Sequence, residues 1–219
     1  MTLLGLSVHD VLTTTRSVRK RLDFDRSVDD NLLRECLDYA VQAPTGSNSQ
    51  GWRFVVVTDP EKKAGLGELY RRGWEQYAGM SASALSLAGG EDSERATQQM
   101  RVMQSAAYLA ENMHRVPAMV IPCLPGRINQ SGFGATSSLA SIIPSTWSFM
   151  LAARERGLGT CWTTIHLLFE EEAAELLHIP YEEVSQVALI TVGHTLGTDF
   201  KPASRDGGAA AVTSWNTWD

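Results

Sequence analysis

The spacing of hydrophobic residues predicts helices and short strands in turn along the chain. Apolar side chains recur every three or four positions from Leu32 to Val41, which predicts a helix with one buried face. Ser27 and Asp30 form a capping pair before this pattern, and Pro44 ends it. A helix is therefore expected between the capping pair and the proline.

Two short β-branched runs predict buried strands, residues 53–58 (RFVVVT) and residues 118–124 (AMVIPCL). Between them, residues 61–77 and 97–114 have helical spacing. Residues 78–96 mix small and charged side chains without a regular period, so we expect a mobile excursion from the fold there.

The second half of the chain repeats this alternation. A long helix is predicted from Ser138 to Arg156, with its first turns disturbed by Pro144. Residues 157–164 (GLGTCWTT) follow, and then come an acidic-start helix over residues 170–177 and a strand over residues 186–193.

The tail, residues 201–219, has almost no apolar period. Such a segment cannot build a core with itself, so we expect it to lie across another surface, for example a partner subunit. The 219 residues are 43% hydrophobic and 20% charged, which is enough for one sizeable core. A single domain over residues 1–219 is therefore predicted.

The formal net charge of -6 argues against a general attraction to polyanions. We accordingly expect no nucleic-acid partner and no binding to anionic membrane surfaces. No window of roughly 18 uncharged apolar residues is present, so no membrane span is expected. Any anion must be held by a local cluster of basic side chains.

The cysteines Cys36, Cys123 and Cys161 are far apart, and the N-terminus has no signal-peptide pattern. A reduced, cytoplasmic setting is expected. The histidines show no metal-ligand spacing, so no metal site is predicted, and the absence of a GxSxG motif argues against a hydrolase serine. A nucleophilic pair of His114 and Cys161 stays open, although a buried structural cysteine is favoured. Four methionines are expected to fill the core: Met100, Met103, Met113 and Met150.

Two basic segments are candidates for an anion site. In TTRSVRKR, Arg16 and Arg19 flank Ser17 at a spacing that brings both guanidinium groups together in a turn, and this fork of donors matches phosphate oxygens. The alternative is a solvated basic face. Residues of the tail can likewise close over a phosphate or simply keep the tail soluble, namely Lys201, Ser204 and Arg205.

Two loops rich in small residues are the other candidates. Residues 43–52 (APTGSNSQGW) offer short donors and acceptors around Gly46, although an ordinary helix-to-strand loop has the same composition. Residues 157–164 can expose backbone amides, or they form a helix end followed by a strand. The latter segment is no dinucleotide fingerprint, because its GxG follows a helix and no third glycine opens one.

The order and spacing of these segments resemble the nitroreductase family of flavoproteins. The resemblance rests on TRSVRKRL, APTGSNSQGWRFVVV, RGLGTCWTT, VGHTLGTDFKPASR and SWNTW, which together span nearly the whole chain. It implies an α+β fold, a three-layer α-β-α sandwich with a central mixed sheet. It also implies bound FMN and an intertwined homodimer, in which the C-terminal extension crosses to the partner.

The resemblance further implies which residues bind the cofactor. Arg16, Ser17, Val18 and Arg19 would hold the ribityl phosphate and the pyrimidine side of the flavin, with Arg19 near N1 and O2. Lys201 and Arg205 would clamp the phosphate from the tail. The loop residues that would reach the FMN of the other subunit are Pro44, Thr45, Gly46 and Asn48.

Beside the isoalloxazine ring, the resemblance places Trp162, Thr163 and Thr164, with a backbone amide near Thr164 donating to N5. No catalytic side-chain acid or base is required. The segment from Trp74 to Thr97 is the candidate lid over the acceptor, with Trp74 and Tyr77 as stacking residues or, equally, as core residues.

The implied activity is ping-pong transfer of hydride from NAD(P)H through flavin N5 to a nitroaromatic, quinone or related aromatic acceptor. Two alternatives stay open: a non-catalytic FMN-sequestering protein, and another flavin chemistry such as reductive dehalogenation or flavin fragmentation. The chain departs from the family pattern at Thr15, at Gly51 and at Asp206-Gly207. These departures leave the donor open, including a deazaflavin.

Overall fold

Antiparallel strands form the centre of the fold in the computed structural model, which describes residues 3–80, 94–128, 132–203, 205 and 207–218. The strands follow the order β1-β2-β5-β3 across the sheet, and the short strand β4 pairs with the end of β2. Their bounds are Arg53–Val57 for β1, Ala118–Pro125 for β2, Leu158–Thr163 for β3, Val184–Gln186 for β4 and Leu189–His194 for β5.

The prediction of a mixed sheet needs correction, because every ladder between these strands is antiparallel. Helix α5 (Phe133–Glu155) carries the chain from β2 to β3, which run in the same direction. They do not pair, since β5 lies between them, with its His194 opposite Leu158 of β3. Within the described residues, parallel pairing is confined to isolated bridges such as Ser17 with Thr160.

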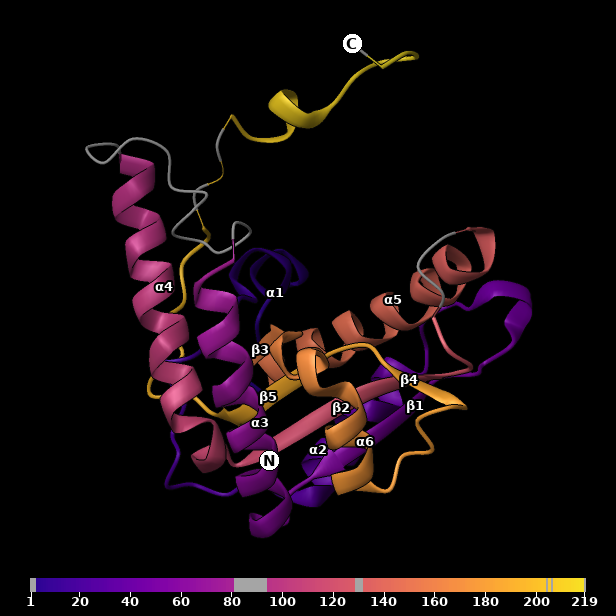
Figure 1. Cartoon of the computed structure of the whole chain (residues 1–219). Helices are drawn as coiled ribbons and strands as arrows, with labels where there is room; N and C mark the ends of the chain where they lie inside the picture. Colours follow the sequence, from indigo (N-terminus) through magenta and orange to yellow (C-terminus); the bar gives the residue numbers. More distant parts are fainter. Residues whose placement is uncertain (1–2, 81–93, 129–131, 204, 206, 219) are drawn as a thin grey trace.

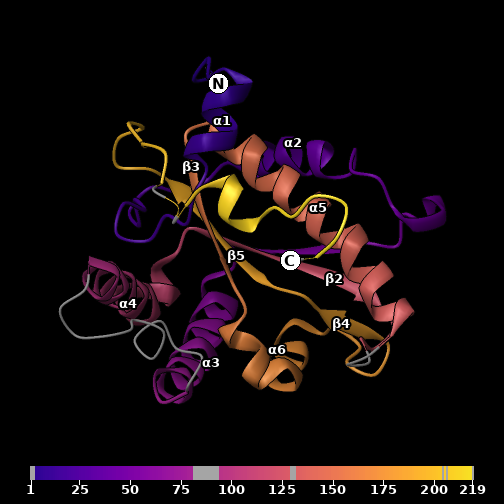
Figure 2. The ribbon, with the colours of Figure 1, turned by 90° about the horizontal axis from the view of Figure 1, so that it is seen from above.

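Helices cover both faces of the sheet and make three layers (Figure 2). On one face lie α5, α1 (Val8–Thr14) and α2 (Asp30–Ala40). On the other face lie α3 (Pro60–Ala78), α4 (Glu94–Asn112) and α6 (Glu170–Leu177). Helices α2 and α5 bury apolar side chains directly against the strands, whereas α1 packs mainly on α5 and α4 on α3.

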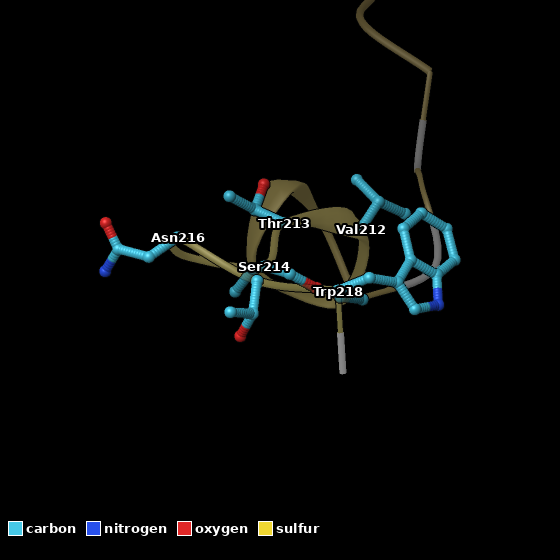
Figure 3. A pocket seen from close by; sticks show the side chains of 8 residues that line it. Val212, Thr213, Ser214, Asn216 and Trp218 are labelled. Atoms are coloured by element: carbon cyan, nitrogen blue, oxygen red, sulfur yellow. The ribbon is translucent and has the colours of Figure 1, made fainter.

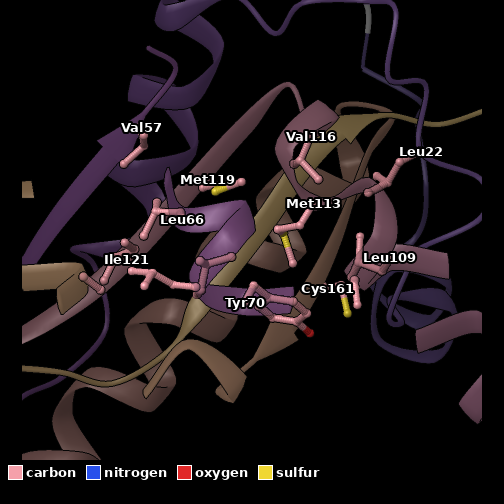
Figure 4. Packing of buried hydrophobic residues seen from close by; sticks show 14 of the residues in the cluster. Leu22, Val57, Leu66, Tyr70, Leu109, Met113, Val116, Met119, Ile121 and Cys161 are labelled. Carbon is pink, nitrogen blue, oxygen red and sulfur yellow. The ribbon is translucent and has the colours of Figure 1, made fainter. Parts of the chain in front are cut away.

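The alternation of side chains along β2 supplies a core to each face. Met119, Ile121 and Cys123 pack with α3 and α4 in the cluster shown in Figure 4, whereas Ala118 and Val120 pack with α2 and α5. Because successive side chains of a strand point to opposite faces, one apolar run serves two helical layers. Each large aliphatic side chain fully buried in this way contributes roughly 1.5–3 kcal/mol.

Several sequence predictions are confirmed with shifted boundaries. The predicted helices over residues 61–77 and 97–114 correspond to α3 and α4, and residues 170–177 form α6. The cap of α2 is Asp29, whose side chain accepts a hydrogen bond from Asn31 N, so the predicted pair of Ser27 and Asp30 is wrong. Helix α1 is short, starts at a capping box of Ser7 and Asp10, and was not predicted from the sequence.

The second half shows two further differences. Helix α5 begins at Phe133 and continues through Pro144, which lies on its exposed face, where water can satisfy the carbonyl that the proline leaves without a donor. The predicted strand over residues 186–193 is divided, because Gln186 pairs with β2 in β4 and Leu189 begins β5. Met113 and Met150 are buried as expected, but Met100 is 48% exposed on α4.

The tail leaves the end of the sheet and runs away from the helical layers, with a short helical turn at Ala209–Val212 (Figure 1). Its large apolar side chains are uncovered, since Val212 and Trp215 are 83% exposed and Trp218 is 97% exposed. The predicted excursion over residues 78–96 falls mostly on residues 81–93, which lie outside the described residues.

Candidate functional site

The basic segment near the N-terminus lies alongside β3. Val18 N donates to the carbonyl of Thr160 at 2.8 Å, and Ser17 forms a bridge with the same residue. The approach depends on Gly159, because a Cβ there would lie 2.9 Å from the Cβ of Val18 and 2.7 Å from Cγ2 of Thr195. The GLG motif thus brings Arg16 and the residues after it against the sheet.

A second close approach brings α3 to the end of β3. At Gly73, an added Cβ would lie 2.8 Å from both the carbonyl oxygen and Cγ2 of Ile165. This contact places Tyr70 and Trp74 of α3 beside Trp162 and the residues that follow it. Glycine at this position is required by space, because any side chain would push the helix away.

Two hollows result, and Arg19 lines both. The first, of about 220 Å³, lies between α3, α4 and the end of β3, and four aromatic side chains line it together with aliphatic groups, threonines and Arg19. The second, of about 240 Å³, is lined by residues 16–21 with Ser105 and Phe200. An aromatic space therefore adjoins a basic one, which is the shape required by a planar ring system that carries an anionic group.

The basic hollow keeps positive charge available in an acidic protein. Arg21 is paired with Asp199 at 2.5 Å, and Arg16 donates to the carbonyl of Lys201 at 2.9 Å. Arg19 is half-buried and makes no ion pair with any residue in the described ranges. An anion placed here would find donors that no carboxylate already occupies.

The aromatic hollow contains the two residues predicted for the acceptor. The rings of Trp74 and Tyr77 are tilted against each other at 5.7 Å between centroids. The hydroxyl group of Tyr70 lies 2.8 Å from Oγ1 of Thr163, and burial raises the pKa of the Tyr70 phenol, so this group stays neutral. Met103, expected in the core, also lines this hollow.

Cys161 does not carry a nucleophilic thiolate. Burial raises the pKa of its thiol, an effect that nearby Arg19 and Ser17 only partly oppose. His114, the other member of the pair left open by the sequence, packs against Gly67 of α3. No hydrogen bond between described residues joins His114 to Cys161, so the structure favours the structural reading of the cysteine.

The loop of residues 44–48 lies elsewhere in the chain. Gly46 N donates to Oγ of Ser141 on α5, and the loop projects at the end of the molecule away from α3 and α4 (Figures 1 and 2). The structure therefore does not bring Pro44, Thr45, Gly46 and Asn48 to the hollows of the same chain. Ser47 and Asn48 have φ values of 54° and 53°, an uncommon conformation that concentrates at functional loops.

The tail reaches the basic hollow only at its beginning. The backbone of Lys201 accepts a hydrogen bond from Arg16, whereas the Arg205 side chain is exposed and forms no hydrogen bond or ion pair in the described part of the chain. A larger hollow along residues 210–218 (Figure 3) is lined by tail residues alone. It is a surface of the extended tail, separate from the two hollows beside β3.

Several residues of the hollows escaped the sequence analysis: Tyr70, Val102, Ser105, Ala106 and Phe200. Tyr70 had a usable signal, because it lies one helical turn before Trp74 and so shares its face. The α4 residues had none, since nothing in the sequence tells which helix packs beside α3.

The parts of the chain that the structure describes contain no cluster of three or more metal-ligating side chains. No helix among the described residues is both long and apolar enough to cross a membrane.

The comparisons with known proteins agree on one family. Residues 12–194 match the sequence pattern of the nitroreductase family. YodC of Bacillus subtilis (strain 168), provisionally named an NAD(P)H nitroreductase, is 26% identical over 154 residues, which are 69% of this chain and 73% of YodC.

Solved structures show the same fold. Oxidised iodotyrosine deiodinase bound to FMN and 3-iodo-L-tyrosine superposes with a TM-score of 0.71 at 19% identity, over 97% of this chain and 100% of that one. The FMN and NADPH-dependent nitroreductase NfnB from Sphigopyxis sp. strain HMH gives a TM-score of 0.68 at 21% identity, with the same coverage of 97% and 100%.

Proposed function

This chain belongs to the nitroreductase family, and we propose that it is an FMN-dependent oxidoreductase that uses NAD(P)H to reduce a nitroaromatic, quinone or related flat acceptor. The observation that carries this proposal is the position of Arg19 between a basic and an aromatic hollow. FMN has the matching form, with a dianionic phosphate at one end and a planar ring at the other.

The basic hollow supports binding of the phosphate end. Arg16 and Arg19 supply guanidinium donors from residues 16–21, and Ser17 supplies a hydroxyl group. Lys201 begins the tail beside Arg16, so its side chain and that of Arg205 can add charge once the tail is docked. In a protein of net charge -6, such local clustering is what allows an anion to bind.

The end of β3 supports binding of the ring. Trp162, Thr163 and Thr164 line the aromatic hollow, and the N–H of Thr164 makes no backbone hydrogen bond with another described residue. This amide is therefore free to donate to a ring nitrogen. Arg19 lies where the two hollows meet and would stabilise negative charge on the pyrimidine side of the ring.

When bound, FMN would supply the hydride carrier that links a nicotinamide donor to an acceptor in a ping-pong cycle. The chain's own residues then need to orient the bound donor and acceptor and to exclude water. The walls formed by Trp74 and Tyr77 favour a flat apolar partner above the ring, and the neutral phenol of Tyr70 adds no charge to this space. No side-chain acid or base is needed for this work.

We further propose that the active form is a homodimer in which each site takes residues from two chains. Two observations support it. The loop of Pro44, Thr45, Gly46 and Asn48 is held against Ser141 of α5 and lines neither hollow of its own chain, so a second copy would have to supply its expected contact with FMN. The tail leaves its own helices and exposes Trp215 and Trp218, which a partner would cover.

An absorbance spectrum of the purified, desalted protein tests the proposal, followed by anaerobic addition of NADH or NADPH. Flavin bands that bleach with a nicotinamide support both the cofactor and the donor. Bands that persist with both donors but respond to chemical reduction point to a deazaflavin donor or to FMN storage. A colourless protein that takes up no added FMN would contradict the proposal.

A further inference from the structure

Arg154, near the end of α5, is a buried cation without a carboxylate partner in the described part of the chain. Its residue exposure is 5%, and its Nη1 is buried without a hydrogen bond to any described residue. A charge in this position is costly unless its remaining donors are well used. The remaining donors are Nε and Nη2, and both form hydrogen bonds.

The guanidinium of Arg154 contacts two segments that are far apart in the sequence. Nε and Nη2 donate to Oγ1 of Thr14 at 3.2 and 3.1 Å, at the last residue of α1. Nη2 also donates to the carbonyl oxygen of Thr198 at 3.1 Å, just before the tail. One side chain thus ties the start of the basic segment to the start of the tail.

Phe200 completes this arrangement. Its ring lies under the guanidinium groups of both Arg154 and Arg21, with Cζ at 5.0 and 4.3 Å from the ring centre. Phe200 also lines the basic hollow, and the next residue, Lys201, accepts the hydrogen bond from Arg16. The contacts of Arg154 therefore lead directly to the hollow without Arg154 itself lining it.

From these contacts we propose that Arg154 is a positioning residue for the phosphate end of FMN. It holds the residues that follow Thr14 and the residues that follow Thr198 at a fixed separation, so that the donors of Arg16 and the tail converge on one anion. This inference rests on the proposed FMN site, and it adds a residue that affects FMN binding without lining the hollow itself.

The test compares FMN with riboflavin, which has the same ring and no phosphate. Both are titrated into flavin-free full-length protein by flavin fluorescence, using wild type and Arg154→Met. We expect Arg154→Met to weaken FMN binding by about 10-fold or more and riboflavin binding by less than about 2-fold, since only the phosphate contacts are misplaced. At saturating FMN, kcat should be retained.

Arg156→Met is the matched control. Arg156 is also a buried arginine at the end of α5 with one nitrogen lacking a partner, but it pairs with Glu35 of α2 at 2.5 Å. Its loss should leave the preference for FMN over riboflavin unchanged. If Arg154→Met does not fold, Thr14→Val replaces it, because that change removes the acceptor of two Arg154 hydrogen bonds and keeps the guanidinium.

The outcomes separate the inference from the function on which it rests. A wild-type chain that binds neither flavin, or both equally, contradicts the proposed phosphate site and the inference with it. A wild-type preference for FMN that survives in Arg154→Met and Thr14→Val overturns the positioning role alone. Equal weakening of both flavins also overturns it, because general structural damage would act on the shared ring.

Discussion

Gly159 of β3 and Val18 of the basic segment approach so closely that a Cβ on the glycine would lie 2.9 Å from the Cβ of the valine. The contact is accompanied by the hydrogen bond from Val18 N to the carbonyl of Thr160. Residues on either side of Val18 line the basic hollow. The proposed cofactor site therefore depends on a glycine whose role is purely steric.

Gly159→Ala should separate these two segments. We expect a loss of about 1–3 kcal/mol in the free energy of unfolding, because the methyl group overpacks a rigid contact, together with weaker FMN binding. Urea denaturation and FMN titration measure the two effects. Gly134→Ala on α5 is the control: nothing lies within 4 Å of its Cβ, so it should leave FMN binding unchanged and should not lower the free energy of unfolding. An alanine at position 159 that costs nothing would contradict the steric role.

Arg19→Ala should weaken FMN binding by about 10- to 100-fold, the cost of losing a charge-assisted hydrogen bond of roughly 1.5–3 kcal/mol. The reason is that Arg19 lines both hollows and has no carboxylate partner among described residues. Arg34→Ala, on the exposed side of α2, serves as the control. Unchanged FMN affinity in Arg19→Ala would remove Arg19 from the site.

Trp74→Ala should weaken binding of the acceptor more than binding of the cofactor. Trp74 lines the aromatic hollow and packs with Tyr77, so its loss should raise KM for aromatic acceptors by about 3- to 10-fold while FMN stays bound. Trp74→Phe keeps an aromatic face and should have the smaller effect. Steady-state kinetics with one quinone and one nitroaromatic measures this. Loss of FMN from both variants would instead indicate a core role for Trp74.

Stability should fall in mild acid because of His166. Burial lowers the pKa of His166 from its ordinary value of 6.5 to about 4, an effect that nearby Gln186 only partly opposes, and the geometry gives neither ring nitrogen a hydrogen-bond partner among the described residues. Between these two pH values the unfolded chain holds the extra proton, so the free energy of unfolding decreases as pH drops from 6.5 to 4. The loss should reach about 3 kcal/mol.

The matched variant is His166→Leu, which removes the titrating ring. Urea denaturation at several pH values between 4 and 7 should show a flatter profile for this variant than for wild type. His194, whose pKa burial also lowers, acts in the same direction and accounts for part of the remaining slope. Identical pH profiles for wild type and His166→Leu would show that the ring is not buried as a neutral group.

A mixed dimer tests whether each site uses two chains. Asn48→Ala and Arg19→Ala should each impair every site of their own homodimer. A heterodimer of the two should regain about half of the wild-type activity, because one of its two sites carries both changes and the other carries neither. Tagged chains purified in sequence provide this species. If a heterodimer of confirmed mass regains no activity, both residues belong to a site that a single chain forms.

The sequence alone determined the local elements and the residue types of the site. Periodicity located α2, α3 and α5, because each buries one face whose apolar side chains recur at helical spacing in the sequence, and an acidic first turn located α6. The motifs containing Arg16, Arg19, Trp162 and Thr164 pointed to the family that the comparison confirmed. Boundaries near Phe133 and Asp29 were missed, since caps and an exposed proline depend on their surroundings.

Only the tertiary structure decided which segments meet. The antiparallel order of the sheet follows from β5 lying between β2 and β3, a pairing between distant residues that local spacing does not encode. In the same way, Gly159 and Gly73 each allow one close approach, and Arg154 joins Thr14 to Thr198. Periodicity records which face of an element is buried, but the partner of that face is chosen by packing across the whole chain.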